Sequence, residues 1–299
     1  MTSSSRSDIQ AIAIQISKLR FFISLIVDQK VDRNKTNFGV LPLPNLETKF
    51  VAANTLIDIE KPKKQTSLFD SKEIEALEEK LKKVRHSLFS VRSPSRKREL
   101  REEDKLLREQ IGELLEEHGW GNETAQQLAH WNPYDQNANA EFFNLEWMFG
   151  ETGFDIVIGN PPYVISNDKK LNYETFEKTG DIYALFIEKG VSLLNQNGLL
   201  AFITSNKWMR AGYGKSLRNF LAAKTQPLKL IDFGGYQVFD SATVDSNILI
   251  TRNNNEKLPF NACTIQTDFT IETPLADYFA VHSQTMPTVS QDVWVISSG

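Results

Sequence analysis

Phe154-Asp155-Ile156-Val157-Ile158-Gly159-Asn160-Pro161-Pro162-Tyr163 is the part of this sequence that most restricts its fold. The apolar half predicts a buried β-strand. The strand must end at the prolines, because proline lacks the N–H group that a central strand needs. A residue that precedes proline is driven into extended geometry, which applies to both Asn160 and Pro161. The strand end therefore presents oxygen acceptors and, at the prolines, no backbone donors.

The four residues from Asn160 to Tyr163 predict a site for an amine on a planar ring. The side-chain oxygen of Asn160 and the carbonyl oxygen of Pro161 can converge on one NH2 group. The ring of Tyr163 can stack on a base, a contact worth roughly 1–3 kcal/mol. On these residues alone an alternative stays open, in which the strand ends in a Pro-Pro loop capped by a buried tyrosine.

Other apolar runs alternate with helical patterns around this strand. Further strands are expected at residues 48–53, 198–204, 228–233 and 247–251, and helices at 8–29, 183–194 and around 217–221. The helix at 8–29 repeats Ile and Leu at spacings of three and four, so we expect one face to pack on a core. This alternation predicts an α/β fold with a mostly parallel, doubly wound sheet. Ligands of such sheets bind beyond the carboxyl ends of the strands, where Asn160 lies.

Residues 71–118 interrupt the alternation and predict an inserted helical hairpin. They are rich in Glu, Lys, Arg and Leu, with Ser93-Pro94-Ser95 in the middle. From Lys80 to Arg98 there are eight basic residues and no acidic residue. This tip is a candidate phosphate-binding surface, since phosphates are bound through cations with little sequence readout. Its candidate residues are Lys82, Lys83, Arg85, Arg96, Lys97 and Arg98. The alternative is a solvated, charged hairpin.

The composition limits the class of protein. A chain of 299 residues, 40% hydrophobic and 24% charged, fits one or two globular domains. The net charge of −4 is no overall signature of nucleic-acid binding. The single Cys263 excludes a disulfide framework and predicts a reducing, cytoplasmic location. The four histidines share no metal-ligand spacing, and no N-terminal apolar run is long enough to span a bilayer, so we expect neither a metal site nor a membrane partner.

The motif at 154–163 resembles the catalytic motif of N6-adenine DNA methyltransferases that use S-adenosylmethionine. Three further blocks carry the similarity: Trp131–Gly150, Thr204–Met209 and Asp232–Asn247. They look like parts of the large, fused methyltransferases (subtypes IIG and IIS) of type II restriction–modification systems. The similarity covers roughly residues 8–255 and implies a Rossmann-like, S-adenosylmethionine-dependent methyltransferase sheet.

The resemblance implies catalytic roles for Asn160, Pro161, Pro162 and Tyr163. The Asn160 side chain and the Pro161 carbonyl would accept hydrogen bonds from the N6 amine of the target adenine. Holding both N–H groups favours a pyramidal nitrogen and frees its lone pair, so these acceptors would stabilise the transition state more than the ground state. Tyr163 would stack on the adenine after it has flipped out of the duplex.

Two residues are expected to bind the cofactor by this resemblance. Asp8 lies where the family places an acidic residue for the cofactor ribose, although a plain helix N-cap is an alternative role. Asn54 stands where relatives often have Asp near the cofactor adenine. The amide keeps the hydrogen bonding and removes the charge.

The family's glycine-rich cofactor loop lies upstream of the acidic residue, yet only Met1 to Ser7 precede Asp8. We therefore expect a piece of a longer enzyme, truncated at both ends, whose sheet lacks its N-terminal strand. The expected organisation is a partial catalytic domain at 1–255, with the insertion at 71–118, and the start of a target-recognition region at 256–299. Asp232-Phe233-Gly234-Gly235 is an alternative loop if the domain is circularly permuted.

The predicted function is site-specific DNA adenine-N6 methylation within a restriction–modification system. The expected partners are double-stranded DNA and, if the gene is split, the remaining portions of the enzyme. Two alternatives stay open. One is a non-catalytic remnant that folds and binds DNA. The other is a glutamine-N5 protein methyltransferase, which holds an amide nitrogen with the same tetrapeptide. The sequence predicts neither a nuclease domain nor the DNA sequence that is recognised.

Overall fold

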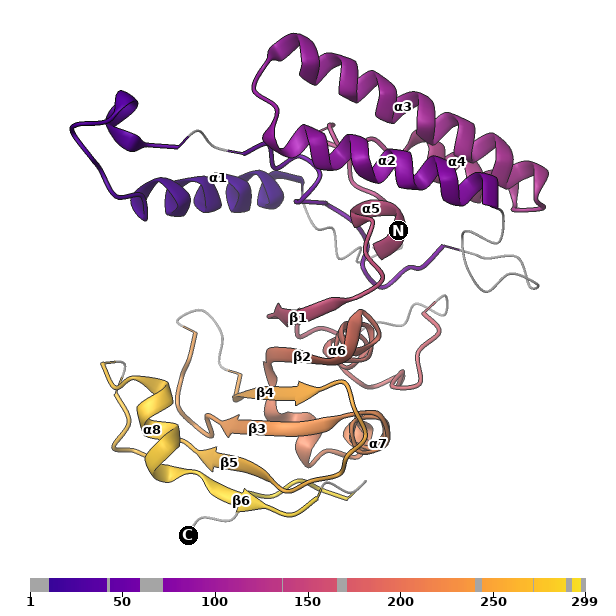
Figure 1. The fold of residues 1–299 in the computed structure, drawn as a ribbon. Coiled ribbons are helices and arrows are strands. Elements are labelled where there is room, and N and C mark those ends of the chain that lie inside the picture. The colour runs from indigo at the N-terminus through magenta and orange to yellow at the C-terminus, as the bar shows by residue number, and fades with distance from the viewer. Residues whose placement is uncertain are drawn as a thin grey trace, which may run out of the picture. The chain divides into compact units, whose positions relative to one another are not determined.

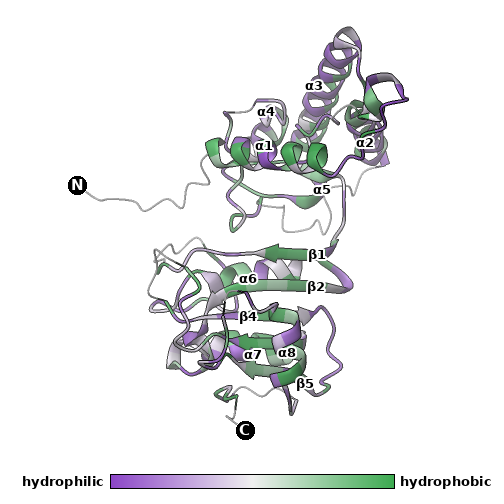
Figure 2. Cartoon of the chain, turned by 90° about the vertical axis from the view of Figure 1, so that its left-hand side faces the viewer, coloured by the Kyte–Doolittle hydropathy of each residue, from purple (hydrophilic) through white to green (hydrophobic). Residues whose placement is uncertain are grey.

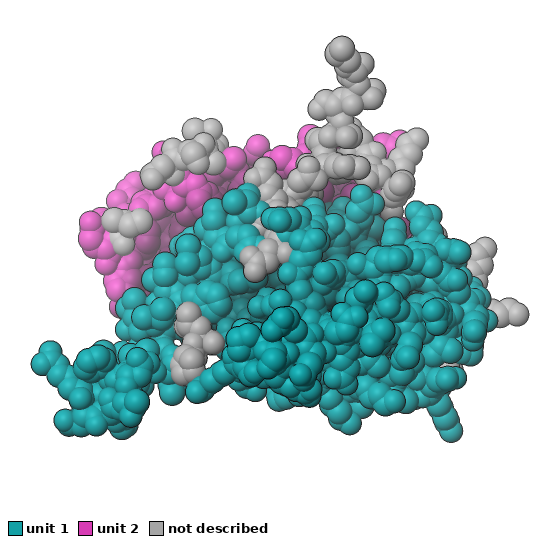
Figure 3. All heavy atoms as spheres, turned by 90° about the horizontal axis from the view of Figure 1, so that it is seen from above, with its two compact units in different colours: residues 1–151 teal, residues 152–299 magenta. Residues whose placement is uncertain are grey.

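The structure, a computed structural model, describes residues 11–41, 44–59, 72–135, 137–165, 171–239, 244–270, 272–288 and 292–296. Asp8 lies outside these residues. The chain divides into two compact units, Met1–Glu151 (unit 1) and Thr152–Gly299 (unit 2) (Figure 3). Among the helices in the described ranges, none has the length and apolar character that crossing a membrane requires.

Unit 2 is built on a six-stranded sheet with the order β1-β2-β4-β3-β5-β6 (Figure 1). The strands are β1 (Phe154–Gly159), β2 (Leu194–Ser205), β3 (Gln226–Asp232), β4 (Ser246–Arg252), β5 (Phe260–Thr264) and β6 (Gln284–Met286). β1, β2, β3 and β5 point in one direction, whereas β4 is antiparallel to β2 and β3, and β6 is antiparallel to β5. The α/β fold class is confirmed, but the expectation that β1 is buried was wrong. β1 is the outermost strand beside β2, and Ile156 and Ile158 are 62% and 76% exposed. The expected mostly parallel pairing was wrong, since β4 is antiparallel to both of its neighbours and β6 is antiparallel to β5. A hydrophobic run does not specify the direction of its strand.

Helices pack on both faces of this sheet. On one face, α6 (Tyr183–Ser192) and α7 (Lys215–Lys224) share a core with Leu200, Leu230 and Leu249. On the other face, α8 (Leu275–His282) packs with Ile231 and Cys263. The consecutive residues Leu230 and Ile231 belong to different cores because side chains alternate along a strand. Two short 3-10 turns, η2 (Asn206–Met209) and η3 (Gly212–Gly214), connect β2 to α7.

Unit 1 is helical. It contains α1 (Ala11–Val27), the 3-10 turn η1 (Thr36–Gly39), α2 (Lys72–Ser90), α3 (Pro94–Glu117), α4 (Asn122–His130) and α5 (Leu145–Phe149). α2 and α3 confirm the predicted hairpin. Ser93 caps α3 by accepting a hydrogen bond from the Arg96 N–H at 3.4 Å. Pro94 follows in the first turn, where its missing N–H costs nothing.

A buried carboxylate holds the helices of unit 1 together. Asp104 on α3 is fully buried, and its two oxygens accept hydrogen bonds from the Nε atoms of Arg85 and Arg108, both at 2.8 Å. Arg85 also donates to the carbonyl of Trp147 on α5, at 2.6 Å. Arg108 donates to two carbonyls at the end of α4. These charge-assisted hydrogen bonds join four helices through one carboxylate.

Two expectations for unit 1 were wrong. Residues 48–53 form no strand. Ala53 makes only an isolated bridge to Ala140, and a strand needs a whole neighbouring segment to pair its backbone. The helix at 8–29 forms as α1, but its apolar side chains do not pack on a core. Ile12, Leu19 and Ile23, on the face expected to be buried, are 61%, 59% and 51% exposed. Figure 2 shows that much of α1 is apolar.

The C-terminal residues extend the sheet of unit 2. β5 pairs with β3, with Ala262 beside Leu230, and β6 pairs with β5. The expected domain limit between residues 255 and 256 therefore lies within unit 2. The boundary between the two compact units falls after Glu151. That residues 256–299 begin a target-recognition region stays a prediction.

Replacing Asp104 with Asn is expected to destabilise unit 1 by about 3–5 kcal/mol, because two buried guanidinium groups lose their counter-charge. Urea denaturation followed by circular dichroism measures this loss. Glu109→Gln is the control, because Glu109 makes only an exposed ion pair with Lys105 at 3.9 Å on the same helix. Its loss should cost less than about 1 kcal/mol. Equal losses in the two variants would contradict a central role for Asp104.

Candidate active site

The motif Asn160–Tyr163 lies at the end of the sheet where the parallel strands have their carboxyl ends. Gly159, the last residue of β1, is paired with Phe202 of β2. At the same end of the sheet, Ser205 at the end of β2 is opposite Ser246, and Asp232 at the end of β3 is opposite Asn247. Two of the blocks singled out by similarity, Thr204–Met209 and Asp232–Asn247, therefore lie at the same end of the sheet as the motif. The third, Trp131–Gly150, belongs to unit 1.

Asn160 and Tyr163 contact each other directly. The hydroxyl group of Tyr163 donates to Oδ1 of Asn160 at 2.9 Å, and the carbonyl oxygen of Ile203 lies 3.3 Å from the same hydroxyl. A hydroxyl has one proton, so it serves one of these acceptors at a time. Asn160 and Pro162 are exposed, whereas Pro161 is buried. The amide oxygen expected to hold an amine is thus accessible, and its partner in this structure is the tyrosine.

The ring of Tyr163 is half-buried. It packs against the core under α6 and meets the ring of Tyr183 edge-on, at 6.1 Å between centroids and 89° between planes. Burial raises the pKa of Tyr163, and a hydrogen bond with Ser246 opposes this effect. The hydroxyl therefore remains a hydrogen-bond donor at neutral pH. The structure brings Tyr163 and Asn160 together, and stacking of the ring on a base stays a prediction.

Buried polar side chains join the ends of β2 and β4. Thr204 donates from Oγ1 to Oδ1 of Asn247 at 3.2 Å, and Asn247 donates from Nδ2 to the carbonyl of Ser205 at 3.3 Å. Thr204 and Asn247 are completely buried, so these hydrogen bonds satisfy groups that water cannot reach. The similarity pointed to both segments without assigning a role to either side chain.

Asp232 joins the loops that follow β2 and β3. Its buried Oδ1 accepts from the Asn206 side chain at 2.8 Å and from the Gly234 N–H at 3.0 Å. Gly234 has a φ of +55°, a conformation that glycine adopts without strain. Because the Gly234 N–H already has this partner, the segment considered as an alternative cofactor loop is tied to its own strand. Sequence reasoning missed this carboxylate, since Asp at a strand end is also common in turns.

The segment after β2 is held rigidly. Trp208 and Met209 are each 1% exposed, and the Met209 carbonyl accepts from the Trp294 N–H at 2.9 Å. The buried Arg218 guanidinium donates to the carbonyls of Trp208 and Ala211. Gly214 lies so close to the Trp208 backbone that a Cβ atom there would overlap with it.

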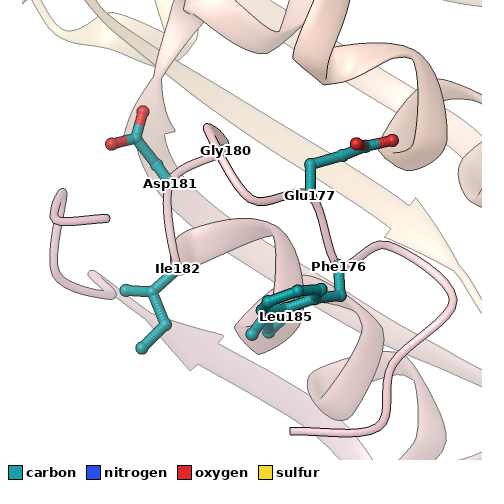
Figure 4. A pocket seen from close by; sticks show the side chains of 6 residues that line it. All are labelled: Phe176, Glu177, Gly180, Asp181, Ile182 and Leu185. Atoms are coloured by element: carbon teal, nitrogen blue, oxygen red, sulfur yellow. The ribbon is translucent and has the colours of Figure 1, made fainter. Parts of the chain in front are cut away.

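A small pocket lies beside the loop that follows the motif. The Ile182 N–H donates to the Val164 carbonyl at 2.7 Å, which ties this loop to the start of α6. The pocket is lined by Phe176, Glu177, Gly180, Asp181, Ile182 and Leu185. In Figure 4, the carboxylates of Glu177 and Asp181 point away from the apolar side chains of Phe176 and Leu185. None of the lining residues belongs to the motif, and we assign the pocket no role.

The structure does not test the two residues expected to bind S-adenosylmethionine. Asp8 is outside the described ranges. Asn54 belongs to unit 1, and its Oδ1 accepts from the Leu56 N–H at 3.3 Å within its own turn. The role of both residues stays a prediction, and no chemical step is derived from them.

The expectation that Arg85 of the hairpin tip binds phosphate was wrong. Arg85 is buried, paired with Asp104 and placed over the Trp131 ring at 5.4 Å. It lies four residues after the buried Leu81, on the helix face that packs against α3. DNA contact by Lys82, Lys83, Arg96, Lys97 and Arg98 stays a prediction.

Comparisons with known proteins agree with the motif. Residues 6–239 match the family described as Eco57I restriction-modification methylase. The type II restriction enzyme and methyltransferase RM.Eco57I of Escherichia coli is 32% identical over 119 residues, covering 36% of this chain and 12% of that protein. The putative type II restriction enzyme and methyltransferase RM.MjaORFECS2P of Methanocaldococcus jannaschii is 26% identical over 311 residues, covering 84% and 26%. The alignments thus span about an eighth to a quarter of the length of these relatives.

Among solved structures, the ATP-dependent type ISP restriction-modification enzyme LlaBIII bound to DNA has a TM-score of 0.42 with 14% sequence identity. The similarity covers 56% of this chain and 14% of that chain.

Gly214→Ala is expected to destabilise unit 2 by about 1–3 kcal/mol, because the added methyl group has no space beside Trp208. Gly212→Ala is the matched control, since a Cβ at Gly212 meets nothing within 4 Å. Alkylation of Cys263 measures the opening of unit 2, because burial raises the pKa of this thiol to about 11 and protects it in the folded state. Equal alkylation rates in the two variants would contradict the tight packing at Gly214.

Proposed function

Because the chain belongs to the Eco57I restriction-modification methylase family, we propose that it holds the target base of a site-specific, adenine-N6 DNA methyltransferase. The enzyme would use S-adenosylmethionine and act within a restriction–modification system. The observation that supports this most is the pairing of Asn160 with Tyr163 at the carboxyl edge of β1, where an acceptor oxygen lies beside an aromatic ring.

The chain's own residues act on the amine of the adenine. Oδ1 of Asn160 and the carbonyl oxygen of Pro161 accept one N–H each. An adenine amine is a poor nucleophile, because its lone pair is delocalised into the ring. Two acceptors placed for a pyramidal nitrogen oppose this delocalisation and stabilise the developing charge of the transition state. The cofactor would supply the electrophilic methyl group when bound.

The side-chain oxygen of Asn160 has two lone pairs, so the amine can join the Tyr163 hydroxyl there or replace it. The Ile203 carbonyl, 3.3 Å from the hydroxyl, is available as the replacement acceptor. The exchange therefore leaves no buried donor without a partner, which would otherwise cost about 1–3 kcal/mol. The tyrosine ring stays beside the site through this exchange and can stack on the flipped base.

The proposed partner is double-stranded DNA, together with any remaining portions of the enzyme. The proposed location is the cytoplasm, where the DNA is accessible. Cys263, a buried thiol with no disulfide partner, is compatible with a reducing compartment. Glutamine-N5 methylation and a non-catalytic remnant are the alternatives that the following assay separates.

Asn160→Ala is expected to lower methyl transfer to adenine by about 10²–10³-fold, as the loss of one transition-state acceptor does. Tyr163→Ala should lower it by roughly 10–100-fold through lost stacking. Tyr163→Phe keeps the ring and should stay within about tenfold of the unsubstituted chain. The assay transfers labelled methyl from S-adenosylmethionine, in large excess, to unmethylated genomic DNA, and detects N6-methyladenine after digestion to nucleosides.

A protein release factor serves as the competing substrate in the same assay. Label on glutamine instead of adenine would support the protein methyltransferase. Transfer to adenine that is unaffected by Asn160→Ala would contradict the assigned role of the amide. No transfer by the unsubstituted chain, despite the excess of donor, would favour the non-catalytic remnant.

A further inference from the structure

A long part of unit 2 has basic residues and no acidic residue. From Lys189 to Ile231 the sequence has seven Lys or Arg residues and neither Asp nor Glu. Three of them are exposed after the end of β2: Lys207 and Arg210 lie on the segment that connects β2 to α7, and Lys215 is the first residue of α7. We call these three residues the 207–215 surface. Because the whole chain has a net charge of −4, this surface is a local exception to the overall charge.

The 207–215 surface follows directly from the edge of the sheet that carries the motif. Ile203, whose carbonyl lies 3.3 Å from the Tyr163 hydroxyl, precedes Lys207 by four residues along the chain. Asn206, next to Lys207, is tied to Asp232 at 2.8 Å. The cations therefore stand beside the candidate base site rather than at the opposite end of the strands.

The backbone of this segment is fixed, so the cations project from defined positions. The buried Trp208 and Met209 anchor it, and Gly214 packs against the Trp208 backbone. A rigid backbone lowers the conformational entropy lost when the side chains are immobilised on a ligand. A merely solvated charged loop would not need this many internal contacts.

Two of the three cations of this surface have no ion-pair partner in the described part of the chain. Neither Lys207 nor Lys215 makes an ion pair with a described residue. Arg210 lies 3.9 Å from Asp232, and its side chain is 62% exposed. On the hairpin tip, by contrast, Lys83 and Arg96 are paired with Glu79 and Glu99. Lys82, Lys97 and Arg98 of the tip also make no ion pair with a described residue. The 207–215 surface is the stronger candidate for binding an anion near the base because it lies in the same unit as the motif.

We propose that Lys207, Arg210 and Lys215 bind the phosphates of the DNA strand that carries the target adenine. This inference rests on the proposed function, because a flipped nucleotide keeps its flanking phosphates beside the base site. Cations on backbone phosphates set the position of the protein without reading sequence. The surface thus places the strand, and Asn160 and Tyr163 receive the base.

The test is the salt dependence of DNA binding, measured by fluorescence anisotropy with a labelled duplex and no methyl donor. In Lys207→Gln/Lys215→Gln, the slope of log K against log salt concentration should fall by about 1.8, since each phosphate contact contributes about 0.9. Lys224→Gln is the matched control: Lys224 is an exposed lysine at the far end of α7, near the start of β3, and its loss should leave the slope unchanged.

An unchanged slope in the double variant, or an equal fall in Lys224→Gln, overturns the proposal. A fall only after neutralising Lys82 and Lys83 assigns the phosphates to the hairpin and also overturns it. Circular dichroism and alkylation of Cys263 check that each variant is folded.

Asn160→Ala separates this inference from the proposed function, because it should lower methyl transfer by about 10²–10³-fold and leave the salt slope unchanged. If the double variant lowers the slope while the unsubstituted chain transfers no methyl group, the phosphate surface stands and the catalytic proposal fails. If transfer depends on Asn160 while the double variant binds with the full slope, the phosphate surface fails.

Discussion

The antiparallel pairing of β4 with both β2 and β3 is the constraint on which the candidate site depends. It sets Ser205 opposite Ser246 and Asp232 opposite Asn247, so the ends of two parallel strands meet the start of β4. The hydrogen bonds of Asn247 then join β2 to β4, and those of Asp232 join the loops after β2 and β3. A slip of one residue would turn these side chains to the other face of the sheet.

The site combines the paired strand ends of β2, β3 and β4 with a hydrogen bond that can change its acceptor. The loop after β1 contacts these strands through Tyr163, whose hydroxyl has acceptors on both Asn160 and Ile203. A donor with two acceptors can release one of them without becoming unsatisfied. β2 continues into the segment from Asn206 to Lys215, which presents its cations beside the base site. Base holding and phosphate holding therefore share one scaffold in unit 2.

Sequence reasoning succeeded where local chemistry is decisive and failed where distant atoms decide. β1, β2, β3, β4 and the hairpin of α2 and α3 were predicted from apolar runs, proline and helical spacing. Residues 48–53 have the composition of a strand, but only Ala140 lies beside them to pair. Arg85 was counted among the exposed cations because charge is visible in a sequence, whereas its partner Asp104 lies on the next helix.

The sequence by itself determined that an apolar strand ends in an amide, two prolines and a tyrosine. It did so because hydrophobic period and the missing N–H of proline act between neighbours in the chain. Only the tertiary structure decided that the Tyr163 hydroxyl donates to the side-chain oxygen of Asn160 and that Asp232 joins two loops by hydrogen bonds. It also decided that Arg85 is buried in an ion pair with Asp104. These contacts depend on strand order and helix packing, which bring together groups that are far apart in the sequence.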